Sequence, residues 1–364
     1  MRPRKVLVVG VTGLVGFAAA KRFGSDPMWD VIGAARRTPR SLPGVESIQV
    51  DLQDRDGAAA VLGRLEGVTH LVYAALFEKP EVAAGWRARD QMDINLAMLA
   101  NTLDPLLATS PVEHVTLLQG TKAYGAHVQA MAVPGREREP RHPHENFYWL
   151  QEDELARRRD AHGFATTILR PVVIFGESLG APLNPIPPLG VYAAALKAAG
   201  EPLHFPGGHA FITEAIDADL LADVMHWAAE SSAAADQTFN VANGDVFTLR
   251  NVWPVIADAF GMEVGEDRPV RLTEEVPSFG PRWASVHDRF QLTAPRELGA
   301  FVDRSFEYLD MLSGYGAVHP PPPALVSTIK LRKAGFDGCI DTEDMLVKWI
   351  RHHQAMRYFP PRHW

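Results

Sequence analysis

Short apolar runs alternate with longer segments of helical periodicity through the first half of the chain. The apolar runs predict strands near residues 5–10, 30–35, 47–50, 69–74, 112–119 and 165–170. Between them, apolar positions spaced three and four apart predict helices near residues 14–24, 55–65, 84–108 and 146–162. Strands that alternate with helices in this order favour a parallel sheet with helices on both faces. The predicted fold class is therefore α/β, a Rossmann-type doubly wound parallel sheet.

The pattern changes after residue 177. Glycines and prolines become frequent there and predict a loop that leads into a second lobe. A strand at Phe239–Asn243 is expected to return to the main sheet. The remaining periodic segments predict helices at residues 217–230, 249–260 and 341–358.

Three glycines follow the first apolar run at a spacing of three residues: Gly10, Gly13 and Gly16 in the segment GVTGLVG. A strand, a glycine turn and a helix in this order leave free backbone N–H groups and a positive dipole end, where a pyrophosphate can sit close to the chain. This GxxGxxG spacing near the N-terminus is typical of the extended short-chain dehydrogenase/reductases. It predicts a dinucleotide cofactor.

The end of the second predicted strand indicates which cofactor. Arg36 lies 20 residues past Gly16, and no carboxylate lies between Val31 and Arg40. An acidic residue usually stands there to hold the ribose 2′-hydroxyl of NAD, whereas a guanidinium binds a 2′-phosphate with two planar donors. Arg36 and Arg37 therefore favour NADPH/NADP+. Asp51 and Leu52, after the third strand, are expected to bracket the adenine.

Length and composition bound the remaining possibilities. The chain has 364 residues, of which 46% are hydrophobic, and so exceeds a minimal nucleotide-binding domain. We expect a NADP-binding domain over residues 1–178, to which 212–247 returns. Residues 179–211 and 248–364 are expected to form a smaller, mostly helical substrate lobe. The two lobes are thus predicted to be interleaved along the chain.

Charge and cysteine content exclude several function classes. A net charge of −8 argues against nucleic acid or an anionic membrane as a general partner. Cys339 is the only cysteine, so no intramolecular disulfide can form and no metal site is expected. The sequence has no long apolar run and no signal-peptide core, which predicts a soluble cytoplasmic protein. A homodimer is left open.

The expected catalytic pattern of short-chain reductases is altered. They take their acid from Tyr-x-x-x-Lys on one helix face, but here Tyr148 is followed four residues later by Glu152. The usual serine after strand five is also absent, and Lys122 stands near that position instead. If Lys122 points towards Tyr148, it replaces the missing helix lysine from the opposite wall of the pocket. Asn95, polar on an apolar helix, either braces this region or is a surface amide.

These residues carry a family resemblance. The chain is similar to the progesterone 5-beta-reductase/iridoid synthase enzymes of the extended short-chain superfamily. The matching segments are GVTGLVG, Ala35–Arg37, Gly120–Tyr124, Asn146–Asp153, Arg170–Gly176 and Phe239–Asp245. The resemblance implies NADPH-dependent reduction of carbon–carbon double bonds conjugated to a carbonyl, with Lys122 and Tyr148 as the catalytic residues.

The same resemblance, with the glycine motif, implies a set of cofactor contacts: Gly10, Thr12, Gly13, Leu14, Val15, Gly16, Arg36, Arg37, Asp51, Leu52, Ala74, Gln119, Ile174 and Asn184. Two departures from the family pattern stand beside it. Plant members have two consecutive tyrosines where this chain has Tyr148 and Trp149, so the first tyrosine is expected to be the functional one. The residues flanking Lys122 also differ, which leaves its role less defined.

Enone chemistry suits this altered set. Hydride added to the β-carbon of an enone leaves negative charge on the carbonyl oxygen, and Tyr148 can donate a hydrogen bond to that oxygen while carbon is protonated later from solvent. Reduction of a ketone needs outright protonation of an alkoxide. The sequence therefore favours a small apolar enone or carbonyl substrate. The alternatives are a carbonyl reductase, an epimerase, against which Arg36 and Arg37 argue, and a non-catalytic NADP(H) sensor.

Overall fold

Seven parallel strands form the central sheet of this computed structural model, which describes residues 4–37, 42–79 and 85–364. Their order across the sheet is β3-β2-β1-β4-β5-β6-β9, and each neighbouring pair is parallel. The strands are β1 (Arg4–Val9), β2 (Trp29–Ala35), β3 (Val45–Gln49), β4 (His70–Tyr73), β5 (His114–Leu118), β6 (Ala165–Pro171) and β9 (Gln237–Val241). The return of Phe239–Asn243 to the main sheet is thus confirmed for the strand itself.

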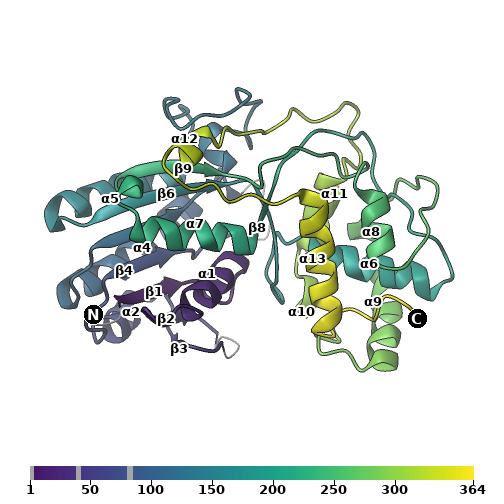
Figure 1. Cartoon of the computed structure of the whole chain (residues 1–364), viewed down its shortest axis with the longest axis horizontal. Helices are drawn as coiled ribbons and strands as arrows, with labels where there is room; N and C mark the ends of the chain where they lie inside the picture. The colour runs from purple at the N-terminus through teal and green to yellow at the C-terminus, as the bar shows by residue number, and fades with distance from the viewer. Residues whose placement is uncertain (1–3, 38–41, 80–84) are drawn as a thin grey trace. The chain divides into compact units, whose positions relative to one another are not determined.

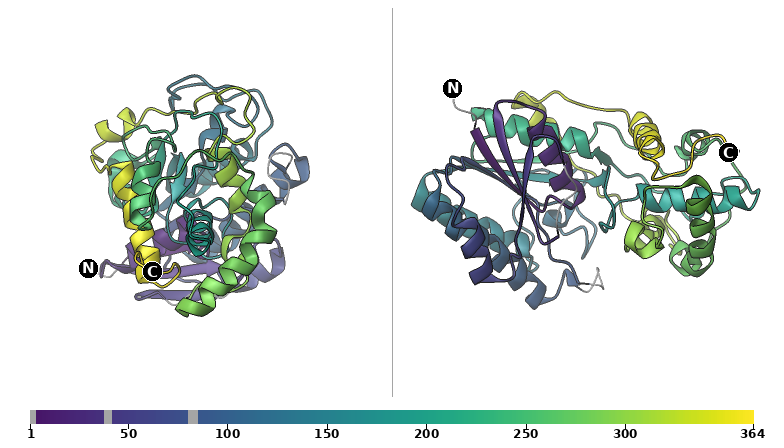
Figure 2. Two further views of the ribbon diagram at one scale, coloured as in Figure 1. Left: turned by 90° about the vertical axis from the view of Figure 1, so that its right-hand side faces the viewer. Right: turned by 90° about the horizontal axis from the view of Figure 1, so that it is seen from below.

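Helices cover both faces of this sheet (Figures 1 and 2). One face carries α1 (Leu14–Gly24) and α7 (Ala218–Glu230), and the other carries α2 (Arg55–Leu62), α4 (Arg89–Thr109) and α5 (Phe147–His162). The short helices η1 (Thr121–Tyr124), η2 (Ser232–Ala234) and α12 (Ile329–Lys333) lie in the connections. The predicted doubly wound α/β fold is confirmed.

The strands form because their apolar runs are buried on both sides. Leu7 and Leu71 are fully buried, as are Val115 and Leu117 on β5. Parallel strands covered by helices on both faces need such continuous apolar runs, which is why periodicity located them well. Polar side chains define helix starts: Asp54 accepts a hydrogen bond from the N–H of Gly57 at the beginning of α2.

The strand order reverses between β1 and β4, at the edge where ligands usually bind in open α/β sheets. Gly10 directly follows β1 and has φ +88°, and a Cβ there would lie 2.7 Å from the carbonyl oxygen of Ala74. At Gly16 a Cβ would collide with the carbonyl oxygen of Gly10. The two glycines therefore let the turn, the helix α1 and the end of β4 approach closely.

The chain divides into two compact units. The first contains Met1–Val172, Asp219–Val241 and Val326–Gly338, and the remaining segments form the second. The segment 326–338, which carries α12, falls in the first unit rather than in the expected substrate lobe. The assignment of one unit to the nucleotide and the other to the substrate stays a prediction.

The second unit is largely helical. It holds a two-stranded parallel sheet of β7 (Val173–Phe175) and β8 (Ala215–Asp217). Its helices are α6 (Ile186–Ala198), α8 (Trp253–Ala259), α9 (Leu272–Phe290), α10 (Leu298–Val302), α11 (Ser305–Leu312) and α13 (Thr342–Ala355). The expectation of a loop after residue 177 was wrong for α6. Pro187 and Pro188 occupy its first turn, where the missing N–H has no helical partner to lose.

The described part of the chain contains no helix that is both long and apolar enough to span a lipid bilayer.

Candidate active site

One asparagine ties the two predicted catalytic positions together. Asn146 precedes α5, and its side-chain oxygen accepts a hydrogen bond from the backbone N–H of Tyr148 at 3.0 Å. Its amide nitrogen donates to the backbone carbonyl of Lys122, also at 3.0 Å. A single buried side chain therefore joins the short helix η1, which follows β5, to the start of α5.

Trp86 contacts both catalytic side chains. The Nζ atom of Lys122 lies 3.9 Å from the centroid of the Trp86 ring, which is cation–π geometry. The Tyr148 ring meets the same indole edge-on at 5.4 Å. The Phe147 ring packs against both aromatic rings, with its centroid 4.7 Å from that of Trp86 and 4.7 Å from that of Tyr148. Trp86 was not recognised in the sequence, because no local motif distinguishes it from a core tryptophan.

The Tyr148 phenol is buried, with 7% of the residue exposed. Burial raises the pKa of the phenol above its ordinary value, the negative charge of Glu78 raises it further, and Arg170 opposes them. The hydroxyl lies beside the end of β5, because a Cβ built on Gly120 would be 3.6 Å from it. The Tyr148 side chain is therefore a neutral phenol that can donate a hydrogen bond. Its hydroxyl lies beside Gly120, just after the end of β5.

Lys122 is partly buried against this cluster. Burial lowers the pKa of its ammonium, and the negative charge of Glu78 raises it in partial compensation. Among the residues that the structure describes, no hydrogen bond joins Nζ of Lys122 to the hydroxyl of Tyr148. The two side chains share Trp86 as a neighbour, so the structure brings them to one cluster, while their action as a catalytic pair stays a prediction.

Glu152, at the position where short-chain reductases carry the helix lysine, belongs to a buried network. Arg170 donates to Glu152 at 3.1 Å and to the side-chain oxygen of Gln119 at 3.0 Å. The amide of Gln119 donates to Glu152 at 2.9 Å and, more weakly, to the carbonyl of Tyr148 at 3.4 Å. Arg141 adds a second guanidinium to Glu152 from the exposed side. This network fixes the first turns of α5 against β5 and β6.

The glycine turn fits the diphosphate part of a dinucleotide. Gly13 precedes α1 and has no side chain to cap the first N–H groups of the helix. A Cβ on Gly13 would meet one described neighbour within 4 Å, the carbonyl oxygen of Gly10 at 3.3 Å. Thr12 lies in the same turn, and Leu14 and Val15 open the helix.

The predicted adenosine contacts follow β2, β3 and β4. Arg36 and Arg37 come directly after β2 and are exposed, and neither guanidinium is bonded to any residue in the described ranges. Asp51 is exposed and Leu52 is buried just after β3, while Ala74 follows β4 and donates to the carbonyl of Val9 at 3.0 Å. These positions all lie at the carboxyl edge of the sheet, where a dinucleotide is expected.

Two predicted cofactor contacts, Gln119 and Asn184, make hydrogen bonds within the protein, and a third, Ile174, lies in the second unit. The Gln119 amide is engaged in the Glu152 network. Asn184 is buried in the second unit, where its amide donates to the carbonyl of Gly176 and the hydroxyl of Ser178, each at 2.9 Å. Ile174 lies in β7 of the same unit. Cofactor contact at these positions stays a prediction.

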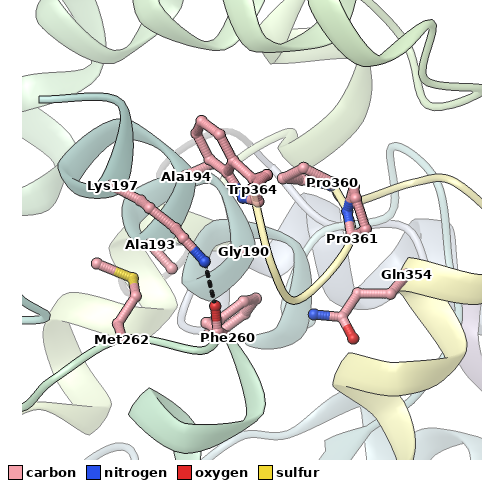
Figure 3. A pocket seen from close by; sticks show the side chains of 10 residues that line it. All are labelled: Gly190, Ala193, Ala194, Lys197, Phe260, Met262, Gln354, Pro360, Pro361 and Trp364. Carbon is pink, nitrogen blue, oxygen red and sulfur yellow. Dashed lines mark hydrogen bonds between the residues drawn. The ribbon is translucent and has the colours of Figure 1, made fainter. Parts of the chain in front are cut away.

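A pocket in the second unit contains none of the predicted site residues (Figure 3). Lys197 lies on its wall and donates to the carbonyls of Phe260, Gly261 and Arg362, at 2.6 to 3.3 Å. Because its ammonium is held by three carbonyls, Lys197 serves to fasten the C-terminal segment. The pocket is lined by Gly190, Ala193, Ala194, Lys197, Phe260, Met262, Gln354, Pro360, Pro361 and Trp364.

Comparison with known proteins gives similarities over most of the chain. The family model described as "NAD dependent epimerase/dehydratase family" matches residues 6–242. An (S)-8-oxocitronellyl enol synthase of Nepeta racemosa is 34% identical over 308 residues, which cover 77% of this chain and 74% of the relative. The 3-oxo-Delta(4,5)-steroid 5-beta-reductase of Arabidopsis thaliana is 30% identical over 97% of this chain and 92% of the relative.

Solved structures agree on the fold. UDP-glucose 4-epimerase from Thermus thermophilus, in a complex with NAD, superposes with a TM-score of 0.65 at 17% sequence identity. The match covers 96% of this chain and 99% of that one. At this identity the likeness concerns the architecture alone.

Proposed function

The chain belongs to the NAD dependent epimerase/dehydratase family and, within it, to the progesterone 5-beta-reductase/iridoid synthase-like enzymes, and from this premise we propose that it reduces the C=C bond of α,β-unsaturated carbonyl compounds with NADPH. The observation that carries the proposal is the Tyr148 phenol, buried and neutral, in one aromatic cluster with the Lys122 ammonium. An oxyanion formed in the reaction needs a donor that keeps its proton, and this hydroxyl is one.

The residues present suit the cofactor. Gly13, Leu14 and Val15 would hold the diphosphate at the uncapped start of α1, where N–H groups and the helix dipole favour an anion. Arg36 and Arg37 would pair with a 2′-phosphate, since both guanidinium groups are exposed. The bound cofactor would supply the hydride.

The chain's own residues stabilise the charge that addition creates. When a hydride joins the β-carbon, the electron pair of the C=C bond moves towards the carbonyl, and negative charge collects on its oxygen. The Tyr148 hydroxyl would donate a hydrogen bond to that oxygen. Lys122 would add a nearby positive charge. Solvent then protonates the α-carbon, so no proton relay through a helix lysine is required.

The decisive experiment measures NADPH oxidation by the purified chain on matched pairs of small enones and their saturated ketones, together with a steroid enone. We expect turnover of enones and little or none of the saturated ketones, with the saturated carbonyl compound as product by mass spectrometry. Activity confined to saturated ketones would indicate a carbonyl reductase. Tight NADPH binding without turnover of any substrate would indicate a sensor.

Replacing Arg36 with Asp is expected to reverse the cofactor preference from NADPH towards NADH. The new carboxylate would repel a 2′-phosphate and accept a hydrogen bond from a ribose 2′-hydroxyl. Loss of one bidentate charged contact predicts a fall of about tenfold to a hundredfold in kcat/KM for NADPH. Steady-state kinetics with both cofactors test this, and Arg55→Asp, which begins α2, is the control. An unchanged preference would remove the argument for NADPH.

Location in the cytoplasm and assembly into a homodimer stay predictions.

A further inference from the structure

The short loop after β4 is held in place on both sides of Glu78. The buried Asn95 of α4 accepts a hydrogen bond from the N–H of Phe77 at 2.9 Å and donates to its carbonyl at 2.8 Å. On the other side, Gln91 accepts from the N–H of Lys79 at 2.9 Å. Of the two readings of Asn95, the brace is thus confirmed and the surface amide is wrong. The backbone of Glu78 is fixed between two clamped neighbours.

The Glu78 side chain is directed at Trp86. Its Oε1 accepts a hydrogen bond from the indole Nε1 at 2.7 Å. Trp86 is 2% exposed, so this bond determines how the indole lies in the cluster. The same ring carries the Lys122 ammonium at 3.9 Å and the Tyr148 ring at 5.4 Å. A carboxylate on a clamped loop thus orients the surface on which both catalytic side chains rest.

Among the described residues, three titratable groups from different elements belong to the surroundings of Lys122. Glu78, from the loop after β4, and His127, from the segment after η1, interact electrostatically with its ammonium, and Tyr148, from α5, contacts the same Trp86 ring. Burial lowers the pKa of His127 to about 4, with Lys122 and other positive groups adding to this, so His127 is neutral at physiological pH. Tyr148 is also neutral. Of these three groups, Glu78 is the one whose negative charge offsets the effect of burial on the pKa of Lys122.

We propose that Glu78 is a positioning residue for Lys122: it holds the Trp86 indole against the ammonium and supplies the negative charge that keeps this cation in place. The proposal rests on the proposed function, because it assigns Glu78 to the same site. In this proposal Glu78 does not touch the reacting atoms. It acts through Trp86 and Lys122. Neither the resemblance nor the motifs of the sequence mark this residue.

The test measures the charge state of Lys122 without turnover. Lysines of the full-length protein are reductively methylated with ¹³C-formaldehyde, and the Lys122 signal is assigned by its loss in Lys122→Arg. Glu78→Gln, which keeps the acceptor for Trp86 but loses the charge, is expected to lower the pKa of Lys122 by about one unit. Asp90→Asn removes an exposed carboxylate bound to Lys79 and is expected to leave it unchanged. Glu78→Asp, which keeps the charge, covers the case in which the Gln variant does not fold.

Kinetics then separate this proposal from the proposed function. With an enone substrate, the alkaline limb of kcat/KM should move to lower pH in Glu78→Gln by the same amount, while Asp90→Asn follows the unmodified chain. An unchanged Lys122 signal in Glu78→Gln overturns the role of Glu78, whatever the activity. A lowered pKa in a protein that turns over no enone supports the role of Glu78 and overturns the proposed function. A lowered pKa with an unmoved alkaline limb overturns the link between Glu78 and catalysis.

Discussion

Tyr148→Phe is expected to lower kcat for enone reduction by about 10² to 10³-fold while leaving KM nearly unchanged. The change deletes a single hydroxyl, and a donor aimed at a developing oxyanion is commonly worth roughly 3–4 kcal/mol of the barrier. The effect should fall on kcat because the bond becomes strong when negative charge collects on the oxygen. Steady-state kinetics and thermal unfolding of both proteins are the measurements.

Tyr124→Phe is the matched control for this prediction. Tyr124 is also a buried tyrosine of the first unit, but its hydroxyl donates to the side-chain oxygen of Asn240 at 2.6 Å. Its removal should cost about 1 kcal/mol of stability and little of kcat. If both variants lose activity alike, or if Tyr148→Phe keeps full activity, the phenol of Tyr148 is not the donor.

Arg170→Met is expected to give the largest loss of stability, about 3 kcal/mol in the free energy of unfolding. Its guanidinium pairs with Glu152, and the two side chains are only 8% and 12% exposed. Without Arg170, the buried carboxylate of Glu152 keeps as described partners only Arg141, on the exposed side, and the Gln119 amide, and such a loss costs more than the pair itself contributes. Gln119 would also lose the donor at its side-chain oxygen. Denaturant unfolding followed by circular dichroism measures the change.

Two further variants make this prediction specific. Arg141→Met removes a guanidinium from the same Glu152, but the Arg141 side chain is 41% exposed, so a loss under about 1 kcal/mol is expected. In the double variant Arg170→Met with Glu152→Met, the buried carboxylate is removed as well, and part of the stability should return. Equal losses in the Arg170 and Arg141 variants would contradict the buried-pair interpretation.

Local patterns in the sequence were enough for the central sheet and its glycine turn. Buried parallel strands are continuous apolar runs, and the turn at Gly10 needs glycine because its φ is positive and Ala74 is close. The helix α6 escaped notice because Pro187 and Pro188 resemble a loop when the helix register is unknown. From the amino-acid sequence alone, prolines in the first turn of a helix cannot be told from prolines in a loop.

The site could be predicted only where it follows a motif. Lys122, Tyr148 and Arg170 stand in recognisable segments, whereas Glu78 and Trp86 reach the cluster from a part of the chain without a motif. Glu78 lies between the predicted strand 69–74 and the predicted helix 84–108, and Trp86 lies near the start of that predicted helix, where neither stands out. The ion pair of Glu152 with Arg170 joins residues 18 positions apart and needs the packing of α5 on β6 to be known. Contacts of this kind depend on how helices and strands pack in space, and the spacing of residues in the sequence does not give that packing.

The bridge made by Asn146 has a consequence for how such a protein can diversify. One amide joins the carbonyl at position 122 to the N–H at position 148 and so fixes the two ends of the intervening segment to each other directly. Changes of length within that segment are expected to leave the backbone at positions 122 and 148 in register, provided that the asparagine stays two residues ahead of the tyrosine. The surroundings of the centre could therefore be remodelled over evolution without rebuilding the centre itself.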